Sequence, residues 1–89
     1  MALFELGRTV ATPAALKFCE QHSVNLADLL GRHVSADWGD LTKDDVKANE
    51  DAIAFGARVF SSYKVGDDKV WVITEADRSS TCVLLPSDY

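Results

Sequence analysis

Basic residues are scarce in this sequence. Lys and Arg together number 9, against 14 Asp and Glu, which gives a formal net charge of -5. Proteins hold nucleic acid mainly by placing Lys and Arg against phosphates, so this balance argues against a nucleic-acid partner. A ribonuclease toxin, which needs a basic face, is disfavoured for the same reason.

Long hydrophobic runs are also missing. The longest uncharged apolar stretch is far below the roughly 18 residues that a membrane-spanning helix needs. Residues 1–6 carry Glu5 and no basic segment ahead of an apolar core, which is unlike a signal peptide. We therefore expect a cytoplasmic protein that has no membrane partner.

Cysteine is limited to Cys19 and Cys82, which lie far apart in the sequence. In a cytoplasmic protein we expect both to be free thiols that pack as small apolar residues. Cys19 and His22, with His33 as a third ligand, make only half of a zinc motif. No serine lies in a G-x-S-x-G turn. The sequence therefore predicts no metal site, no cofactor and no catalytic Ser or Cys.

The residues that are present describe one small folded domain. The chain has 89 residues, of which 47% are hydrophobic and 26% charged, a balance typical of globular proteins. Thr12 before Pro13 predicts a helix over residues 13–21, and Asn25 predicts the start of a second helix. A third helix is expected from Thr42 to about residue 55, ending at Gly56 in the left-handed conformation.

After residue 56 the hydrophobic pattern becomes extended. Residues 58–65 and 69–75 flank a short turn that contains Gly66, which predicts a β-hairpin. Residues 80–85 predict a further strand, and residues 6–11 are a weaker extended candidate. The expected fold is α+β, an antiparallel three- to four-stranded meander packed by two or three helices.

The excess negative charge is concentrated in residues 37–51, which we call the acidic window. Six acids stand there against Lys43 and Lys47, a net charge of -4: Asp37, Asp40, Asp44, Asp45, Glu50 and Asp51. Asp44 and Asp45 complement the positive end of the third helix, and Asp40 or Thr42 can cap it. The acids do not follow the spacing of an EF-hand calcium loop. Capping does not explain Asp37, Glu50 or Asp51.

Two aromatic residues near these acids have alternative interpretations. On a helical projection Phe55 lies on the side of Asp51, so it is either an exposed anchor for a partner or is buried beneath the sheet. Trp38 either fills the core or is a second exposed anchor. The candidate partner-binding residues are Asp37, Trp38, Asp40, Asp44, Glu50, Asp51 and Phe55.

The expected turn at residues 75–80 brings together acid, base and hydroxyl groups. It is a weaker candidate for a small polar ligand, through Glu75, Asp77, Arg78 and Ser79. Alternatively, Asp77 and Ser79 are ordinary turn residues, and Arg78 forms an exposed ion pair with Glu75.

Several segments resemble a family of small bacterial proteins found on plasmids and other mobile DNA. They are Trp38-Gly39-Asp40-Leu41, then Asn49, Gly56, Arg58, Ser61 and Tyr63, then residues 71–81 and 84–89. The resemblance covers nearly the whole chain from Gly7 onward. It implies a bacterial cytoplasm and an accessory role, and it supplies no catalytic residue.

These observations predict a non-enzymatic protein-interaction module of a mobile element, for example an inhibitor of host defence. Its acidic surface would occupy one basic site of another protein and gain association rate from electrostatic steering. The alternative is a small ligand-binding or enzymatic domain that uses the turn at residues 75–80. A homodimer, formed through an open sheet edge or through the Phe55 face, is compatible with either function.

Overall fold

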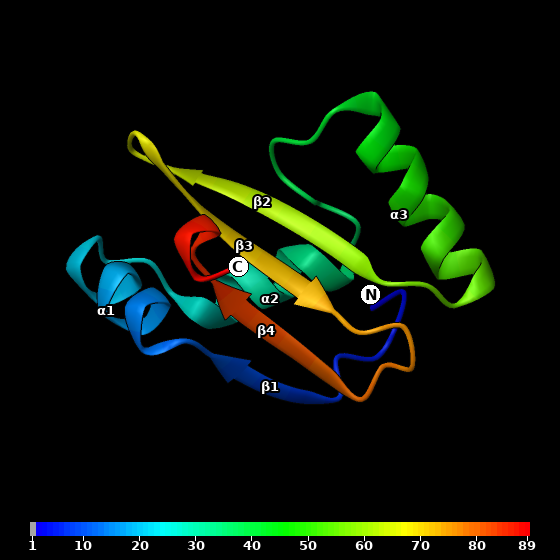
Figure 1. Ribbon diagram of the computed structural model, residues 1–89, viewed down its shortest axis with the longest axis horizontal. Coiled ribbons are helices and arrows are strands. Elements are labelled where there is room, and N and C mark those ends of the chain that lie inside the picture. The colour runs from blue at the N-terminus through cyan, green and yellow to red at the C-terminus, as the bar shows by residue number, and fades with distance from the viewer. Residues whose placement is uncertain (1) are drawn as a thin grey trace.

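The computed structural model describes residues 2–89. Its three helices, four strands and one short 3-10 helix follow each other in the order β1 (Arg8–Ala11), α1 (Pro13–Gln21), α2 (Leu26–Val34), α3 (Lys43–Phe55), β2 (Val59–Val65), β3 (Asp68–Thr74), β4 (Ser80–Leu84) and η1 (Pro86–Asp88). The expected α+β class with three helices is therefore confirmed (Figure 1).

The four strands form one mixed sheet in the order β1-β4-β3-β2. β2, β3 and β4 are antiparallel neighbours, but β1 runs parallel to β4, with Val10 opposite Cys82. The expectation of a purely antiparallel sheet is thus wrong for β1. Only strands joined by a tight turn must be antiparallel. All three helices lie between β1 and β2 in the sequence, so no hairpin sets the direction of β1.

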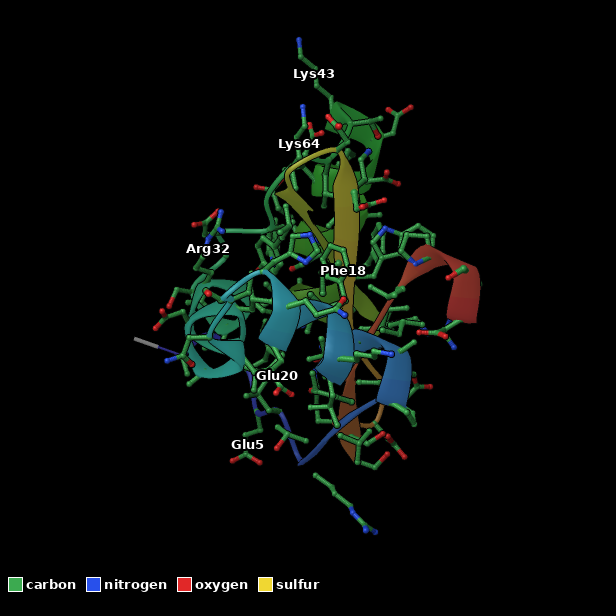
Figure 2. The ribbon with its side chains drawn as sticks, turned by 90° about the vertical axis from the view of Figure 1, so that its left-hand side faces the viewer. Glu5, Phe18, Glu20, Arg32, Lys43 and Lys64 are labelled. Carbon is green, nitrogen blue, oxygen red and sulfur yellow. The ribbon has the colours of Figure 1, made fainter. Side chains whose placement is uncertain are left out.

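The sheet is covered unequally on its two faces. α2 lies across one face and η1 lies on the other, while α3 runs beside the outer edge of β2 (Figures 1 and 2). The main core is formed where α1 and α2 meet the sheet, and it contains Ala15, Cys19, Leu29, Tyr63, Val70, Val72 and Val83. A smaller core lies between α3 and the sheet edge and contains Trp38, Ala52 and Val59.

The helix ends agree with the capping pattern in the sequence. The side chains of Thr12, Asn25 and Thr42 each accept a hydrogen bond from a backbone N–H in the first turn of α1, α2 and α3 respectively. Gly56 ends α3 with φ at 77°, in the left-handed region that glycine tolerates best. These caps are local interactions, so the sequence predicts the helix boundaries well.

Candidate functional site

The structure divides the acidic window between a loop and α3. In the loop, Asp37 forms an ion pair with Arg32, at 2.7 Å between Oδ2 and Nε. This hydrogen bond lowers the pKa of Asp37. The carboxylate of Asp40 lies 3.9 Å from the amine of Lys69. The charge of Asp37 is therefore already paired within the chain, and that of Asp40 is partly offset.

The α3 acids project into solvent from the helix. Asp44 and Asp45 occupy the first turn, where they complement the helix dipole. Asp51 lies 3.9 Å from Lys47 in an exposed i,i+4 pair, which offsets little of its charge. Glu50 is also exposed.

Trp38 is buried, with only 7% of its surface exposed. Its backbone accepts a hydrogen bond from Ser62 N–H, and Asp40 N–H donates to Ser62 O, so the loop pairs with β2 like a short extra strand. The indole packs into the smaller core against α3. The interpretation of Trp38 as an exposed anchor is therefore wrong, because its apolar surface is needed beneath the helix.

Phe55 is fully displayed at the end of α3, with 84% of its surface exposed. Asn49 and Ala52, which lie about 120° and 60° around the helix from Phe55, are 2% and 1% exposed and contact the sheet edge. At 100° per residue, one solvent-facing stripe of the helix contains Asp44, Ala48, Asp51 and Phe55. We call this stripe the α3 outer face; Glu50 is exposed outside it, about 100° around the helix from Asp51.

The turn between β3 and β4 is held by Arg78. Its guanidinium donates to the carbonyl oxygens of Ala57 at 2.5 Å, Ala52 at 3.0 Å, Glu75 at 3.1 Å and Ala76 at 3.2 Å. It also lies over the ring of Phe4. Arg78 therefore fastens the turn to the C-terminal end of α3, in addition to the hydrogen bonds that Ala52 O accepts from the N–H groups of Gly56 and Ala57.

The other residues of this turn also have partners within the chain. Asp77 accepts a hydrogen bond from Ser79 N–H at 2.9 Å, and hydrogen bonding from Ser79 lowers the pKa of Asp77. Glu75 pairs with Arg58, at 3.5 Å, rather than with Arg78 as the sequence suggested. The turn thus holds its polar groups together through contacts that shape the turn itself.

A buried polar network centred on His33 was not expected from the sequence. His33 is fully buried, and its ring nitrogens lie 2.5 Å from Ser61 Oγ and 2.9 Å from Thr74 Oγ1. Thr74 Oγ1 lies 2.7 Å from Thr81 Oγ1, and Thr81 donates to Leu6 O. In the sequence, the only indication of this network is a histidine on the apolar side of α2.

The network assigns the tautomer of His33. Thr81 gives its single hydroxyl proton to Leu6 O, so Thr74 must donate to Thr81 and accept from His33 Nε2–H. Nδ1 then accepts from Ser61. Every member is satisfied only while the ring is neutral, and burial lowers the pKa of His33 to about 4. His33 and Ser61 are both fully buried, so this arrangement forms part of the core.

The face of the sheet opposite α2 carries a cluster of aromatic rings, of which Phe60 and Trp71 are half-buried and Tyr89 is exposed. Trp71 packs edge-on against Phe60 and Tyr89, with ring centroids 5.2 Å and 5.8 Å apart. Arg58 donates to the Tyr89 hydroxyl at 3.1 Å. A shallow groove of about 240 Å³ runs along these side chains and Ile73.

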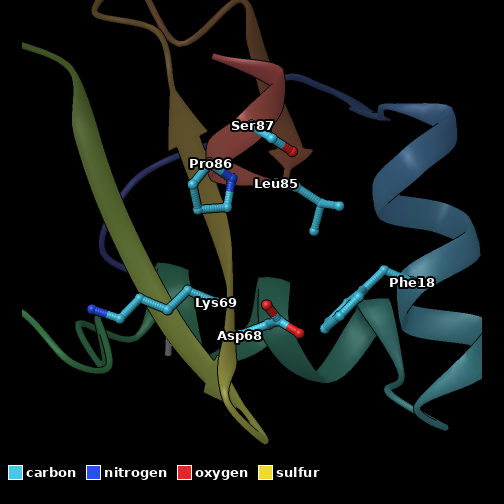
Figure 3. Close-up of a pocket in the computed structure, with 6 residues that line it drawn as sticks. All are labelled: Phe18, Asp68, Lys69, Leu85, Pro86 and Ser87. Carbon is cyan, nitrogen blue, oxygen red and sulfur yellow. The ribbon is translucent and has the colours of Figure 1, made fainter.

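A second groove, of about 260 Å³, separates α1 from the C-terminal segment (Figure 3). Phe18 reaches toward it from α1, Asp68 and Lys69 come from the start of β3, and Leu85, Pro86 and Ser87 form the remaining wall. These six residues supply one acid, one base and one hydroxyl, but no histidine or cysteine. The groove therefore lacks the pairing of nucleophile and imidazole base that acyl transfer uses.

Residues 2–89 contain neither a cluster of metal ligands nor a membrane-spanning helix. In this range, His, Cys, Asp and Glu nowhere gather in groups of three or more that could hold a metal ion. Cys19 is buried, and the ring of His22 stacks on Phe18. None of the helices within this range is both long enough and apolar enough to cross a membrane.

Comparisons with protein-family models, with curated proteins and with solved structures return no match for this chain. The resemblance to small mobile-element proteins accordingly stays a prediction. The chemistry of the chain's own surfaces is what indicates a function.

Proposed function

We propose that this protein is a non-enzymatic interaction module that binds another protein through the α3 outer face. The observation that carries the proposal is the 84% exposure of Phe55 beside Asp51, on a helix whose other side packs against the sheet edge. Exposed aromatic side chains commonly supply a large share of the energy of an interface. Phe55 is suited to such a role because the described residues 2–89 leave 84% of its surface uncovered.

The charges around Phe55 define the chemistry of the partner. Asp44 and Asp51 lie on the same stripe as Phe55, and Glu50 is exposed farther around the helix. A partner that offers an apolar recess bordered by Lys or Arg would complement this surface, and the acids would accelerate the encounter. The patch is small, so it fits one basic site rather than a long phosphate-binding groove.

The resemblance to mobile-element proteins supports a more specific form of this proposal. A protein carried by mobile DNA benefits from inhibiting host defence enzymes, and nucleases present basic surfaces to their substrates. In this form the α3 outer face would occupy such a basic site. The protein would then act by occlusion and would need no cofactor.

The alternative, a ligand-binding or enzymatic site at the turn over residues 75–80, has weaker support. Arg78 already donates to four backbone carbonyl groups. A ligand that used this guanidinium would have to compete with contacts that hold α3 in place.

The test is capture of partners from a bacterial lysate, followed by affinity measurement with the purified partner. The variants are Phe55→Ser, which removes the anchor, and Glu50→Lys with Asp51→Lys, which reverses the charge away from the helix N-terminus. Each should weaken binding by about tenfold or more. Circular dichroism and thermal melting establish that the variants remain folded.

Two matched controls separate this surface from nonspecific effects. Leu3→Ser removes another exposed apolar side chain, since Leu3 is 48% exposed. Glu5→Lys with Glu20→Lys makes the same change in net charge at exposed sites outside α3 and away from any helix N-terminus. Both controls should bind like the wild type. Equal binding by all variants, or equal loss in all, would refute a specific role for the α3 outer face.

A further inference from the structure

The two edges of the sheet differ in what lies beside them. At the β2 edge, Asn49 bonds both backbone groups of Phe60, and the Trp38 loop pairs with Ser62. At the β1 edge, no helix of the described residues 2–89 runs alongside the strand in the way that α3 runs beside β2 (Figure 1). An open edge can accept a strand from another chain.

The pairing of β1 with β4 determines which of its backbone groups face outward. Arg8 N–H donates to Ser79 O, and Thr12 N–H donates to Val83 O. In a parallel ladder, alternate residues of a strand bond to the same neighbour. Arg8, Val10 and Thr12 therefore face β4, and the N–H and C=O groups of Thr9 and Ala11 point away from the sheet.

The surroundings of this edge are apolar. Val10 is 42% exposed and Leu16, in the following helix, is 47% exposed. Beside them runs a groove of about 210 Å³, lined by Thr9, Val10, Ala11, Leu16, Leu26, Leu30 and Val83. β1 also contains no Pro or Lys, the residues that often block edge pairing.

We propose that β1 pairs with β1 of a second copy of this chain, antiparallel about a two-fold axis at Val10. In this register Thr9 lies opposite Ala11 of the second copy, and Ala11 lies opposite its Thr9. Each such pair exchanges two hydrogen bonds. An axis at Thr9 would place Gly7, which lies outside β1, opposite Ala11 of the second copy. An axis at Ala11 would place Thr9 opposite Pro13 of the second copy, which has no N–H. The Val10 axis is thus the register that uses both outward residues fully.

Charge complementarity favours a second copy as the occupant. In this register Arg8 faces Thr12 of the second copy, and the hydroxyl of each Thr12 donates to Asp88 at 2.7 Å. Arg8 and Thr12 lie on the same face of the strand, because alternate side chains share a face. The Arg8 guanidinium can therefore reach Asp88 of the second copy. Within one copy, Arg8 and Thr12 are about 13 Å apart at 3.3 Å per residue.

The result is a symmetric dimer with one continuous sheet across both copies. The contact is isologous, so it closes at two subunits and does not propagate. It leaves the α3 outer face free on each subunit. The dimer and the proposed partner binding are therefore independent and can fail separately.

The experiment is sedimentation velocity of the full chain from micromolar to near-millimolar concentration. The wild type should show a concentration-dependent dimer. Thr9→Pro removes only an outward N–H and leaves the bonds to β4 intact, so it should weaken dimerisation by about tenfold or more while the fold persists. Thr9→Val, which keeps the N–H, is the matched control and should dimerise like the wild type.

A charge swap tests the register itself. Arg8→Glu and Asp88→Arg should each weaken the dimer, and the double variant should restore it at least partly, because the two side chains meet only between copies. A wild type that stays monomeric throughout, a dimer that Thr9→Pro leaves unchanged, or a double variant without recovery would overturn the proposal. Capture of a different protein by a β1 edge that does not self-associate would likewise reject it.

Discussion

The side chain of Asn49 pairs with the backbone of Phe60 as a neighbouring strand would. Its amide nitrogen donates to Phe60 O at 2.6 Å, and its amide oxygen accepts from Phe60 N–H at 2.9 Å. Asn49 is 2% exposed, so these bonds are shielded from water. One helical side chain thus closes part of the β2 edge and fixes α3 against the sheet.

Asn49→Leu should destabilise the protein by about 2 kcal/mol, because it leaves the two backbone groups of Phe60 without their partners. Chemical denaturation measures this loss. Asn49→Asp keeps an acceptor for Phe60 N–H but sets a carboxylate against Phe60 O, so it should also be destabilising. Ala48→Leu, on the exposed side of α3, is the control and should change stability little. An Asn49→Leu variant as stable as the wild type would show that α3 docks through its apolar contacts alone.

The pH dependence of stability should report the burial of His33. Burial lowers its pKa from 6.5 to about 4, so the unfolded chain binds a proton at higher pH than the folded chain does. Stability is therefore complete above pH 6.5 and falls as the pH drops from 6.5 toward 4, by about 3 kcal/mol at 1.36 kcal/mol per pKa unit. Below pH 4 both states bind the proton, and this contribution stays constant.

The control for this prediction is His33→Gln, whose amide can donate and accept but does not titrate in this range. The variant should lose most of the slope between pH 6.5 and 4. Hydrogen bonds lower the pKa values of Asp37, Asp77 and Asp88 below 3.8. Protonation of these carboxylates therefore affects stability only at more acidic pH. An unchanged slope in His33→Gln would mean that another group titrates in this window.

Arg78 should be required for the order of the last turn of α3. Its φ of 60° is unfavourable for a side chain, so Arg78→Gly relieves the backbone but removes the guanidinium. We expect a net loss of about 1 kcal/mol, with faster amide hydrogen exchange over residues 52–57. Arg78→Lys should lose a similar amount, since one ammonium cannot replace the planar fork. Unchanged exchange in Arg78→Gly would rule out the fastening role.

Replacement of glycine by alanine should have opposite effects on stability at two positions. Gly39 has φ at 74°, and an added Cβ would meet Ser62 O and the ring of Tyr63, so Gly39→Ala should cost about 2 kcal/mol or more. Gly31 lies within α2 with open space around it, so Gly31→Ala should stabilise by about 0.5–1 kcal/mol. Thermal melting compares the two, and a gain in Gly39→Ala would contradict the close approach of the loop to β2.

Features that depend on near neighbours were well predicted from the sequence. Thr12 with Pro13, Asn25 and Thr42 mark the helix starts because capping bonds join residues two or three apart. The hairpin turns at Gly66 and the third helix ends at Gly56, and both glycines have a positive φ. The concentration of acids in residues 37–51 is likewise a property of the chain alone.

The candidate site was less predictable, because exposure depends on what lies across the fold. From the sequence, Phe55 and Trp38 could each be either a core residue or an exposed anchor. The neighbouring residues in the sequence did not distinguish these two interpretations. Packing placed Trp38 beneath α3 at 7% exposure and left Phe55 uncovered at 84%. Similarly, nothing near Arg78 in the sequence indicates that the carbonyls of Ala52 and Ala57 lie within its reach.

The sequence by itself determined the α+β class, the helix caps, the hairpin and the position of the acidic window, because each follows from local hydrogen bonding or composition. Only the tertiary structure decided that β1 runs parallel to β4, that Asn49 closes one sheet edge, and that His33 joins a buried network with Ser61 and Thr74. These features join residues that are distant along the chain. Their free energy comes from burying and satisfying groups together, which no local pattern records.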